Sequence, residues 1–215
     1  MGAATRQQEV LEELRRQIRR IERRPARREG VLSCGRPELE PLLPGGGFPR
    51  GCLSALCGGP ASGKTGVALS ALREAQAGGG LAAFVDGRGE LYPPAALALG
   101  VDLARLLIVR PGAERGAREA ALPGLWAAEV LLGSGAFSAV AIDVPLRALS
   151  ASRAEATLRR LRAAAEKGGG AALFLSAPGG PAIPAAFRID LDAVRSRPPL
   201  QAVAGGRGAG GLRGT

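Results

Sequence analysis

An eight-residue segment, Gly58 to Thr65, reads GGPASGKT and fits the phosphate-binding pattern G-x-x-x-x-G-K-[ST] at every fixed position. Such glycines let backbone N–H groups face a phosphate, the lysine reaches the β- and γ-phosphates, and the hydroxyl binds Mg²⁺. The segment follows an apolar run and enters a predicted helix, whose positive end adds attraction. It predicts a site for ATP or another nucleoside triphosphate with Mg²⁺. The alternative is a loop that keeps its shape without useful affinity. The residues assigned to the nucleotide are Gly58, Gly59, Pro60, Ala61, Ser62, Gly63, Lys64 and Thr65.

A carboxylate is expected to complete the metal site. Asp143 ends the apolar run FSAVAID, which we expect to form a strand beside the phosphate-binding strand. An acid at that strand end would hold Mg²⁺ through water, together with the hydroxyl of Thr65. The alternative is an aspartate that caps a turn or helix before Val144 and Pro145.

Two further acids lie in the segment FVDGRGELYPP. Glu90 is the candidate catalytic carboxylate. For Asp86 we expect a role in a turn with Gly87, since aspartate and glycine favour turns.

Composition excludes several kinds of chemistry. The chain of 215 residues has no histidine, which removes Ser-His-Asp and Cys-His catalysis and most zinc sites. The three cysteines lack metal-site spacing, and Cys52 and Cys57 lie in an apolar run, so we interpret these two as buried thiols of a reducing cytoplasm. No apolar run approaches the ~18 residues of a membrane span, and the polar amino terminus predicts no signal peptide.

Short apolar runs alternate with helical patterns through the centre of the chain, which predicts an α/β fold with a mostly parallel sheet flanked by helices. We expect helices near residues 64–77, 94–99, 116–133 and 152–166. Triple glycines at 78–80 and 168–170 are placed to end two of them before a strand. The expected strands are Cys52–Cys57, Leu81–Asp86, Leu106–Val109, Phe137–Asp143 and Ala171–Ser176.

The two ends differ from the centre in composition. The net charge of +10 is concentrated in residues 1–30 and 195–215, each contributing +4. We therefore divide the chain into a basic amphipathic helix with its linker (1–30), a core (31–194) and a flexible Gly/Arg-rich tail (195–215). The basic ends allow weak, sequence-independent DNA binding driven by phosphate contacts, or else serve only as solvated charge.

Residues 6–24 show apolar positions at helical spacing: Leu11, Leu14, Ile18 and Ile21. A helix with this narrow stripe either packs on its own domain or docks on another protein or a second copy of the chain.

The stretch from GGGFPRG through LLIVRP resembles the core of the RecA recombinase, which implies a P-loop NTPase fold with a helix ahead of it. The segments VLSCGRPELEPLLPGGGFPRG, LWAAEVLLGSGAFSAVAID and LRRLRAAAEKGGGAALFL look closer to ImuA-type (SulA-like) proteins of bacterial damage-induced mutagenesis. The resemblance covers about residues 31–192.

The chain departs from the RecA pattern at functional positions. Where RecA-like proteins carry FxDxE, whose glutamate activates water, this chain has Arg88. Ala177 replaces a γ-phosphate-sensing glutamine, and Ala95 replaces an adenine-stacking tyrosine, for which Tyr92 is the nearby candidate. The segments VPLRALSASRAEA and APGGPAIPAA are much shorter than the DNA-binding loops of RecA and carry no aromatic residue.

The resemblance implies a nucleotide-binding accessory protein of SOS mutagenesis and translesion synthesis, with weak or no ATPase activity. Its partners would be RecA, ImuB and an error-prone polymerase, and it would associate with the nucleoid when active. Self-association through residues 6–24 is also expected. One alternative is a DNA-dependent ATPase or recombinase paralogue in homologous recombination. Another is a RecA-superfamily regulator unrelated to DNA.

Overall fold

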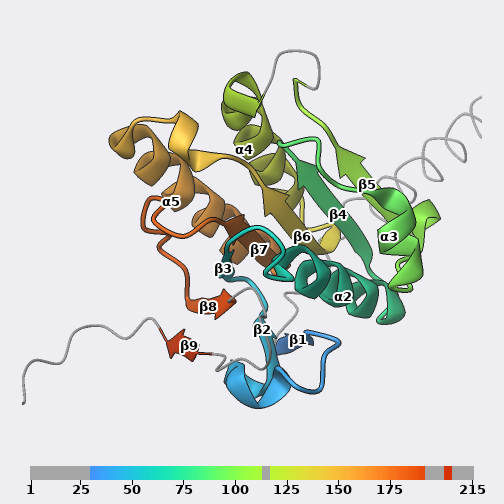
Figure 1. Cartoon of the computed structure of the whole chain (residues 1–215). Helices are drawn as coiled ribbons and strands as arrows, with labels where there is room; N and C mark the ends of the chain where they lie inside the picture. Colours follow the sequence, from blue (N-terminus) through green and yellow to red (C-terminus); the bar gives the residue numbers. More distant parts are fainter. Residues whose placement is uncertain (1–29, 113–116, 192–200, 205–215) are drawn as a thin grey trace, which may run out of the picture.

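The computed structural model describes residues 30–112, 117–191 and 201–204 (Figure 1). A seven-stranded sheet forms its centre, and a small two-stranded sheet joins β1 (Val31–Ser33) to β2 (Gly47–Pro49). The strands of the large sheet are β3 (Leu53–Gly58), β4 (Leu81–Asp86), β5 (Leu106–Val109), β6 (Phe137–Asp143), β7 (Ala171–Ser176), β8 (Phe187–Leu191) and β9 (Gln201–Ala204). The α-helices are α2 (Lys64–Ala77), α3 (Pro93–Ala98), α4 (Ala117–Gly133) and α5 (Ala151–Gly168), and 3-10 turns cover Glu40–Leu42, Pro44–Gly46, Leu103–Arg105 and Leu146–Ala148.

The strands of the large sheet follow the order β5-β4-β6-β7-β3-β8-β9. All neighbouring pairs from β5 to β8 are parallel, and β9 pairs antiparallel to β8. The carboxyl ends of the six parallel strands therefore share one edge of the sheet, where open α/β sheets bind their ligands. The predicted fold class, a mostly parallel sheet with flanking helices, is confirmed.

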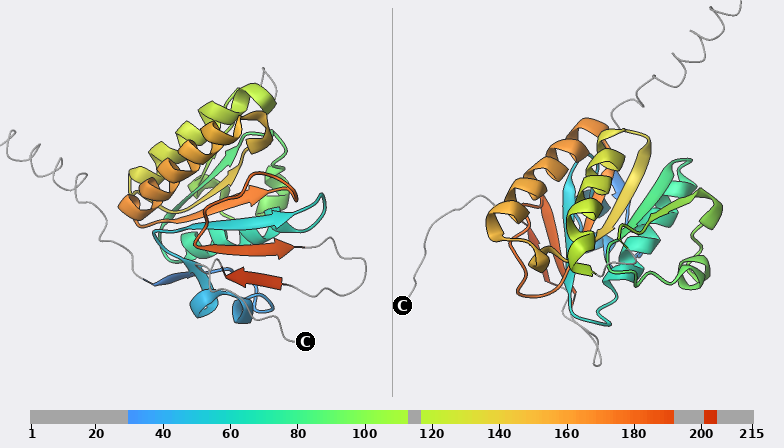
Figure 2. Two further views of the ribbon diagram at one scale, coloured as in Figure 1. Left: turned by 90° about the vertical axis from the view of Figure 1, so that its left-hand side faces the viewer. Right: turned by 90° about the horizontal axis from the view of Figure 1, so that it is seen from above.

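Helices cover both faces of this sheet, as its apolar strands require. Helix α2 packs on one face with the β1–β2 sheet beside it, and α4 and α5 lie side by side on the other (Figure 2). Each face has its own buried core: Leu72 and Phe84 belong to the α2 side, and Leu125, Leu158 and Phe174 belong to the α4–α5 side. Both cores meet at the sheet, so β3, β6 and β7 are buried almost throughout.

The predicted glycine stops are in place. Gly169 ends α5 in the left-handed conformation (φ 73°), and its N–H bonds to the carbonyl of Ala165. Gly79 follows α2 with φ 78°. These positions let the chain reverse directly into β7 and β4, because glycine adopts positive φ without steric cost.

One expectation about strand order was wrong. Asp143 does not lie on a strand beside the phosphate-binding strand β3, since β7 is inserted between β6 and β3. Apolar runs indicate which segments form strands. However, the strands of a sheet covered on both faces all have similar apolar sequences, so the sequence of a strand does not reveal which strands lie beside it.

The sequence also missed four strands. Residues 201–204, which we had assigned to a flexible tail, form β9 opposite β8. β8 was readable from its alternation, since Phe187, Ile189 and Leu191 are buried while Arg188 and Asp190 pair with each other on the other face. The predicted helix at 6–24 and the rest of the tail lie outside the described residues. Within the described ranges, no helix is long and apolar enough to cross a membrane.

Candidate functional site

The segment GGPASGKT connects β3 to α2 at the carboxyl edge of the sheet. Gly63 precedes the helix in the left-handed conformation (φ 82°). Ala61 also has positive φ (57°), and among the described residues it is the only non-glycine that does. Such conformations turn the backbone sharply and persist where the surroundings hold them. The segment therefore forms a tight loop around the start of α2.

The interior of this loop suits a phosphate group. A Cβ atom at Gly58 would lie 2.3 Å from Ser62 Oγ and 2.5 Å from the carbonyl oxygen of Leu191, so only glycine fits there. The hydroxyl of Ser62 is buried and has no hydrogen-bond partner among the described residues. No side chain caps the amino terminus of α2, so its first N–H groups remain available to an anion.

The side chain of Lys64 forms a hydrogen bond within the phosphate-binding loop. Its Nζ atom donates to the carbonyl oxygen of Gly59 at 3.0 Å, so the ammonium folds back over the loop. A phosphate would compete for the same ammonium group and offers a charged acceptor in exchange for a neutral one. The geometry of Gly58 to Lys64 is consistent with the predicted triphosphate site.

Beside the loop, Asp143 forms an ion pair that was not predicted. Its Oδ1 atom accepts from Arg88 Nε at 2.7 Å, and its side chain is only 8% exposed. Burial raises the pKa of the Asp143 carboxyl, and the hydrogen bond and charge of Arg88 oppose that rise. Lys64 and Glu90 also act on this carboxyl, with opposite signs. The departure from the FxDxE pattern thus has a structural consequence: Arg88 neutralises the acid that was expected to hold the metal.

Asp86 has a structural role. Its fully buried carboxylate accepts the backbone N–H groups of Glu90 and Leu91 at 3.0 and 3.1 Å, and Arg110 Nε at 2.9 Å. The second guanidinium nitrogen of Arg110 reaches the carbonyl oxygen of Leu91. Asp86 therefore closes the turn after β4, in agreement with the turn role expected for it. Its partner Arg110 was not predicted, although an arginine directly after a strand on this edge is a signal that the sequence carries.

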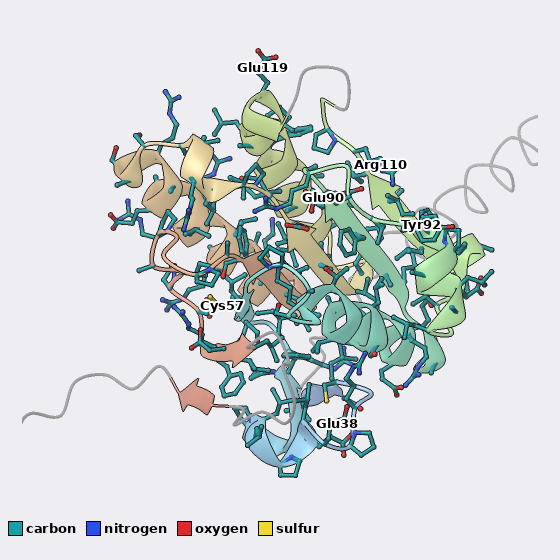
Figure 3. All side chains as sticks on the ribbon, viewed as in Figure 1. Glu38, Cys57, Glu90, Tyr92, Arg110 and Glu119 are labelled. Atoms are coloured by element: carbon teal, nitrogen blue, oxygen red, sulfur yellow. The ribbon has the colours of Figure 1, made fainter. Side chains whose placement is uncertain are left out.

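Glu90 and Tyr92 lie on the segment between β4 and α3 (Figure 3). Glu90 is exposed, and Tyr92, at the start of α3, has 67% of its surface exposed. Their predicted roles, catalysis for Glu90 and base stacking for Tyr92, stay predictions. Both residues are open to solvent and are available to a ligand.

The fit of Mg²⁺ to this site is incomplete. The hydroxyl of Thr65 lies in the first turn of α2, where the pattern requires it. However, the Asp143 carboxylate already has a cationic partner, and Asp86 has another. The described part of the chain contains no group of three or more acidic, cysteine or histidine side chains that could hold a metal ion. The predicted metal role of Asp143 thus conflicts with the charge that the structure places on it.

A cavity of about 270 Å³ adjoins Arg88 between the carboxyl ends of β6 and β7. Phe174, Arg147 and Ala177 are among the residues that line it. Arg147 donates to the carbonyl oxygen of Pro178, so the loop after β6 is tied to the loop after β7. Only seven residues, 144–150, separate β6 from α5. The loops after β6 and β7 are thus joined to each other beside the cavity.

Comparison with known proteins agrees with this architecture. The RecA N-terminal domain family matches residues 15–176. Over 126 residues the chain is 37% identical to Protein RecA of Streptococcus pyogenes serotype M49, and over 98 residues it is 47% identical to Protein RecA of Corynebacterium urealyticum. These alignments cover 59% and 46% of this chain but only 32% and 24% of the relatives, so the chain spans about a third or less of their length.

The family match extends over most of the chain and includes the phosphate-binding loop, β4, β6 and β7. The parallel sheet, with α2 leaving the loop after β3, is the architecture expected of that core. This chain therefore belongs to the RecA family, as a protein with a RecA-like nucleotide-binding core.

Proposed function

We propose that this chain is a nucleotide-binding accessory protein of the ImuA type, which acts in SOS mutagenesis and translesion synthesis with little or no ATP hydrolysis. Its ligand is ATP or a related triphosphate, held by the loop from Gly58 to Thr65. Its partners are RecA and the mutasome proteins, namely ImuB and an error-prone polymerase. The segments that resemble ImuA-type proteins support this role within the RecA family.

The observation that carries the proposal is the ion pair between Arg88 and Asp143. Hydrolysis requires a base beside the attacking water, and losing a general base typically lowers the rate by about 10²–10⁴-fold. A guanidinium cannot accept a proton near neutral pH. Arg88 also occupies the carboxylate of Asp143, so the nearest buried acid is not free to act in its place. Glu90, the remaining candidate, is exposed to solvent, and only its backbone N–H is held, by the carboxylate of Asp86.

The composition of the loops after β6 and β7 further supports the accessory role. The loops after β6 and β7 have no aromatic side chain for stacking bases, and the cations on the cavity between them are Arg88 and Arg147. Two cations without an aromatic neighbour do not form the basic groove with stacking side chains that single-stranded DNA requires. Any contact with DNA would then come from phosphate attraction to the basic ends, without sequence preference.

The test is ATP turnover measured with and without single-stranded DNA. An accessory protein should turn over far more slowly than the ~1–10³ s⁻¹ of typical enzymes, and DNA should not raise the rate. A strong, DNA-stimulated ATPase that Glu90→Gln abolishes would contradict the proposal and favour a recombinase paralogue.

The partners require a separate experiment. Purified RecA, ImuB and the polymerase are each offered to the full chain and to a form lacking residues 1–30. The proposal expects at least one of them to bind the full chain. If none binds the full chain with or without ATP, the mutasome role is wrong, whatever the nucleotide affinity.

A further inference from the structure

Arg88 is held in its place by the turn that follows β4. Asp86 and Asp143 are register partners on β4 and β6, and Gly87 donates its N–H to the carbonyl oxygen of Asp143 at 2.9 Å. On the other side of Arg88, the Asp86 carboxylate binds the N–H of Glu90. The backbone on both sides of Arg88 is thus anchored to the sheet edge, which directs its guanidinium to Asp143.

The Arg88–Asp143 pair joins a buried carboxylate to a partly buried guanidinium. Asp143 is 8% exposed and Arg88 is 30% exposed at side-chain level. A buried carboxylate without a counter-charge is costly, whereas one that is paired and hydrogen-bonded is tolerated. A divalent ion at Asp143 would have to displace this guanidinium, and it would also approach Lys64, which acts on the same carboxyl.

The guanidinium can do more than neutralise Asp143. Its bond to the carboxylate uses Nε. An arginine carries five N–H donors in a planar fork, a geometry that suits both carboxylates and phosphates. Arg88 is partly exposed on the carboxyl edge, the edge on which the phosphate-binding loop also opens. A terminal phosphate between Lys64 and Arg88 would meet two fixed cations.

We propose that Arg88 takes the place of the divalent cation at this nucleotide site, so that the chain binds nucleoside triphosphate equally well without Mg²⁺. The inference rests on the proposed nucleotide binding and goes beyond it. In this chain the positive charge opposite the terminal phosphate is part of the polypeptide. Triphosphate affinity is then set by Lys64 and Arg88 and is independent of the free Mg²⁺ concentration.

The experiment is a titration with a fluorescent ATP analogue, once with excess Mg²⁺ and once with excess EDTA. For the wild-type chain the two dissociation constants should agree within about threefold. Arg88→Ala should weaken binding in EDTA by about tenfold or more, the loss of one charge-assisted contact, while Mg²⁺ restores part of it because Asp143 becomes free. Arg147→Ala, which removes a cation from the same cavity without touching Asp143, should behave as wild type.

Because Arg88→Ala leaves a buried charge unpaired, a second variant guards against misfolding. Arg88→Ala combined with Asp143→Asn removes both charges, and its thermal melting checks that it folds. This double variant should bind more weakly than wild type in both buffers and show no response to Mg²⁺.

The outcomes separate the two proposals. Wild-type binding that is tight with Mg²⁺ and more than about tenfold weaker in EDTA overturns the role of Arg88 but leaves nucleotide binding intact. Equal affinity of wild type and Arg88→Ala in EDTA also overturns it. If the wild type binds the analogue in neither buffer, both the inference and the proposed nucleotide function fail.

Discussion

The backbone N–H of Gly87 bonds to the carbonyl oxygen of Asp143 at 2.9 Å, and the end of β6 leaves little room for a side chain at Gly87. A Cβ atom there would lie 3.0 Å from Val144 Cγ2 and 3.1 Å from that same oxygen, closer than ordinary contacts. The turn after β4 and the end of β6 are therefore fitted to each other at a glycine.

We predict that Gly87→Ala lowers the free energy of unfolding by about 1–3 kcal/mol, the usual cost of overpacking a close contact. Chemical denaturation measures this. Gly133→Ala is the matched control, since its added Cβ would meet the Ala164 side chain at an ordinary 3.9 Å. Within α4 that change should be neutral or slightly stabilising, because alanine favours helix over glycine by up to ~1 kcal/mol. Equal effects at both positions would mean that the contact at Gly87 is unimportant.

Lys64→Ala should weaken triphosphate binding by roughly 2–4 kcal/mol, about 30- to 1,000-fold, because a charge-assisted contact to phosphate is lost. Isothermal titration calorimetry with ATP measures the difference. Lys167→Ala is a fitting control, since Lys167 is the other lysine of the chain and lies exposed at the end of α5. If Lys64→Ala binds as tightly as wild type, the loop does not hold phosphate.

A third prediction concerns residues 6–24, which lie outside the described structure. Changing Leu14 and Ile18 to Asp should abolish association with RecA or a mutasome partner, because it puts charge into the apolar stripe. The melting temperature of the core should stay within a few degrees.

The control for this helix is a double change of Arg16 and Arg20 to Ala, which alters the net charge by the same −2 but leaves the apolar stripe intact. Binding should survive in that variant. Unfolding of the domain by the Leu14 and Ile18 changes would instead identify the helix as an internal brace, and unchanged RecA binding would exclude docking through this stripe.

The buried thiol of Cys34 gives a pH prediction. Burial raises its pKa above the usual 9.0. Below that pH the thiol is protonated in both the folded and unfolded states and has no effect on stability. As the pH rises through 9.0, the unfolded chain loses this proton while the folded chain keeps it, so the free energy of unfolding falls. Between pH 8 and the raised pKa, the free energy of unfolding, measured by denaturation at each pH, should fall more steeply with pH for wild type than for Cys34→Ala. Equal pH dependence of the two proteins would contradict the prediction.

Local sequence patterns predicted the parts of this fold that depend on local physics. The bounds of Leu81–Asp86, Leu106–Val109, Phe137–Asp143 and Ala171–Ser176 agree with the structure, since each is an apolar run with a glycine, aspartate or turn at its end. The phosphate-binding loop was equally readable, because its chemistry lies in consecutive residues.

What the sequence could not provide are contacts between distant segments. The pairing of Arg88 with Asp143 joins residues 55 positions apart, and that of Asp86 with Arg110 joins residues 24 apart. Both depend on which strands are neighbours, and β4 lies between β5 and β6 for reasons of overall packing. The sequence shows a positive charge at position 88 where the RecA pattern has an acid, but the partner of that charge, Asp143, follows only from the fold.

The insertion of β7 between β3 and β6 has a consequence for communication through the protein. The residue that follows β7, Ala177, leaves the sheet between the phosphate-binding loop and Asp143 and leads into the loop of residues 177–186. A polar side chain there would be placed to sense the terminal phosphate and pass its presence to that loop. A methyl group forms no hydrogen bond, so hydrolysis or release of the phosphate would leave this loop unmoved. The protein would then bind nucleotide without the change between two conformations that hydrolysis drives in a recombinase.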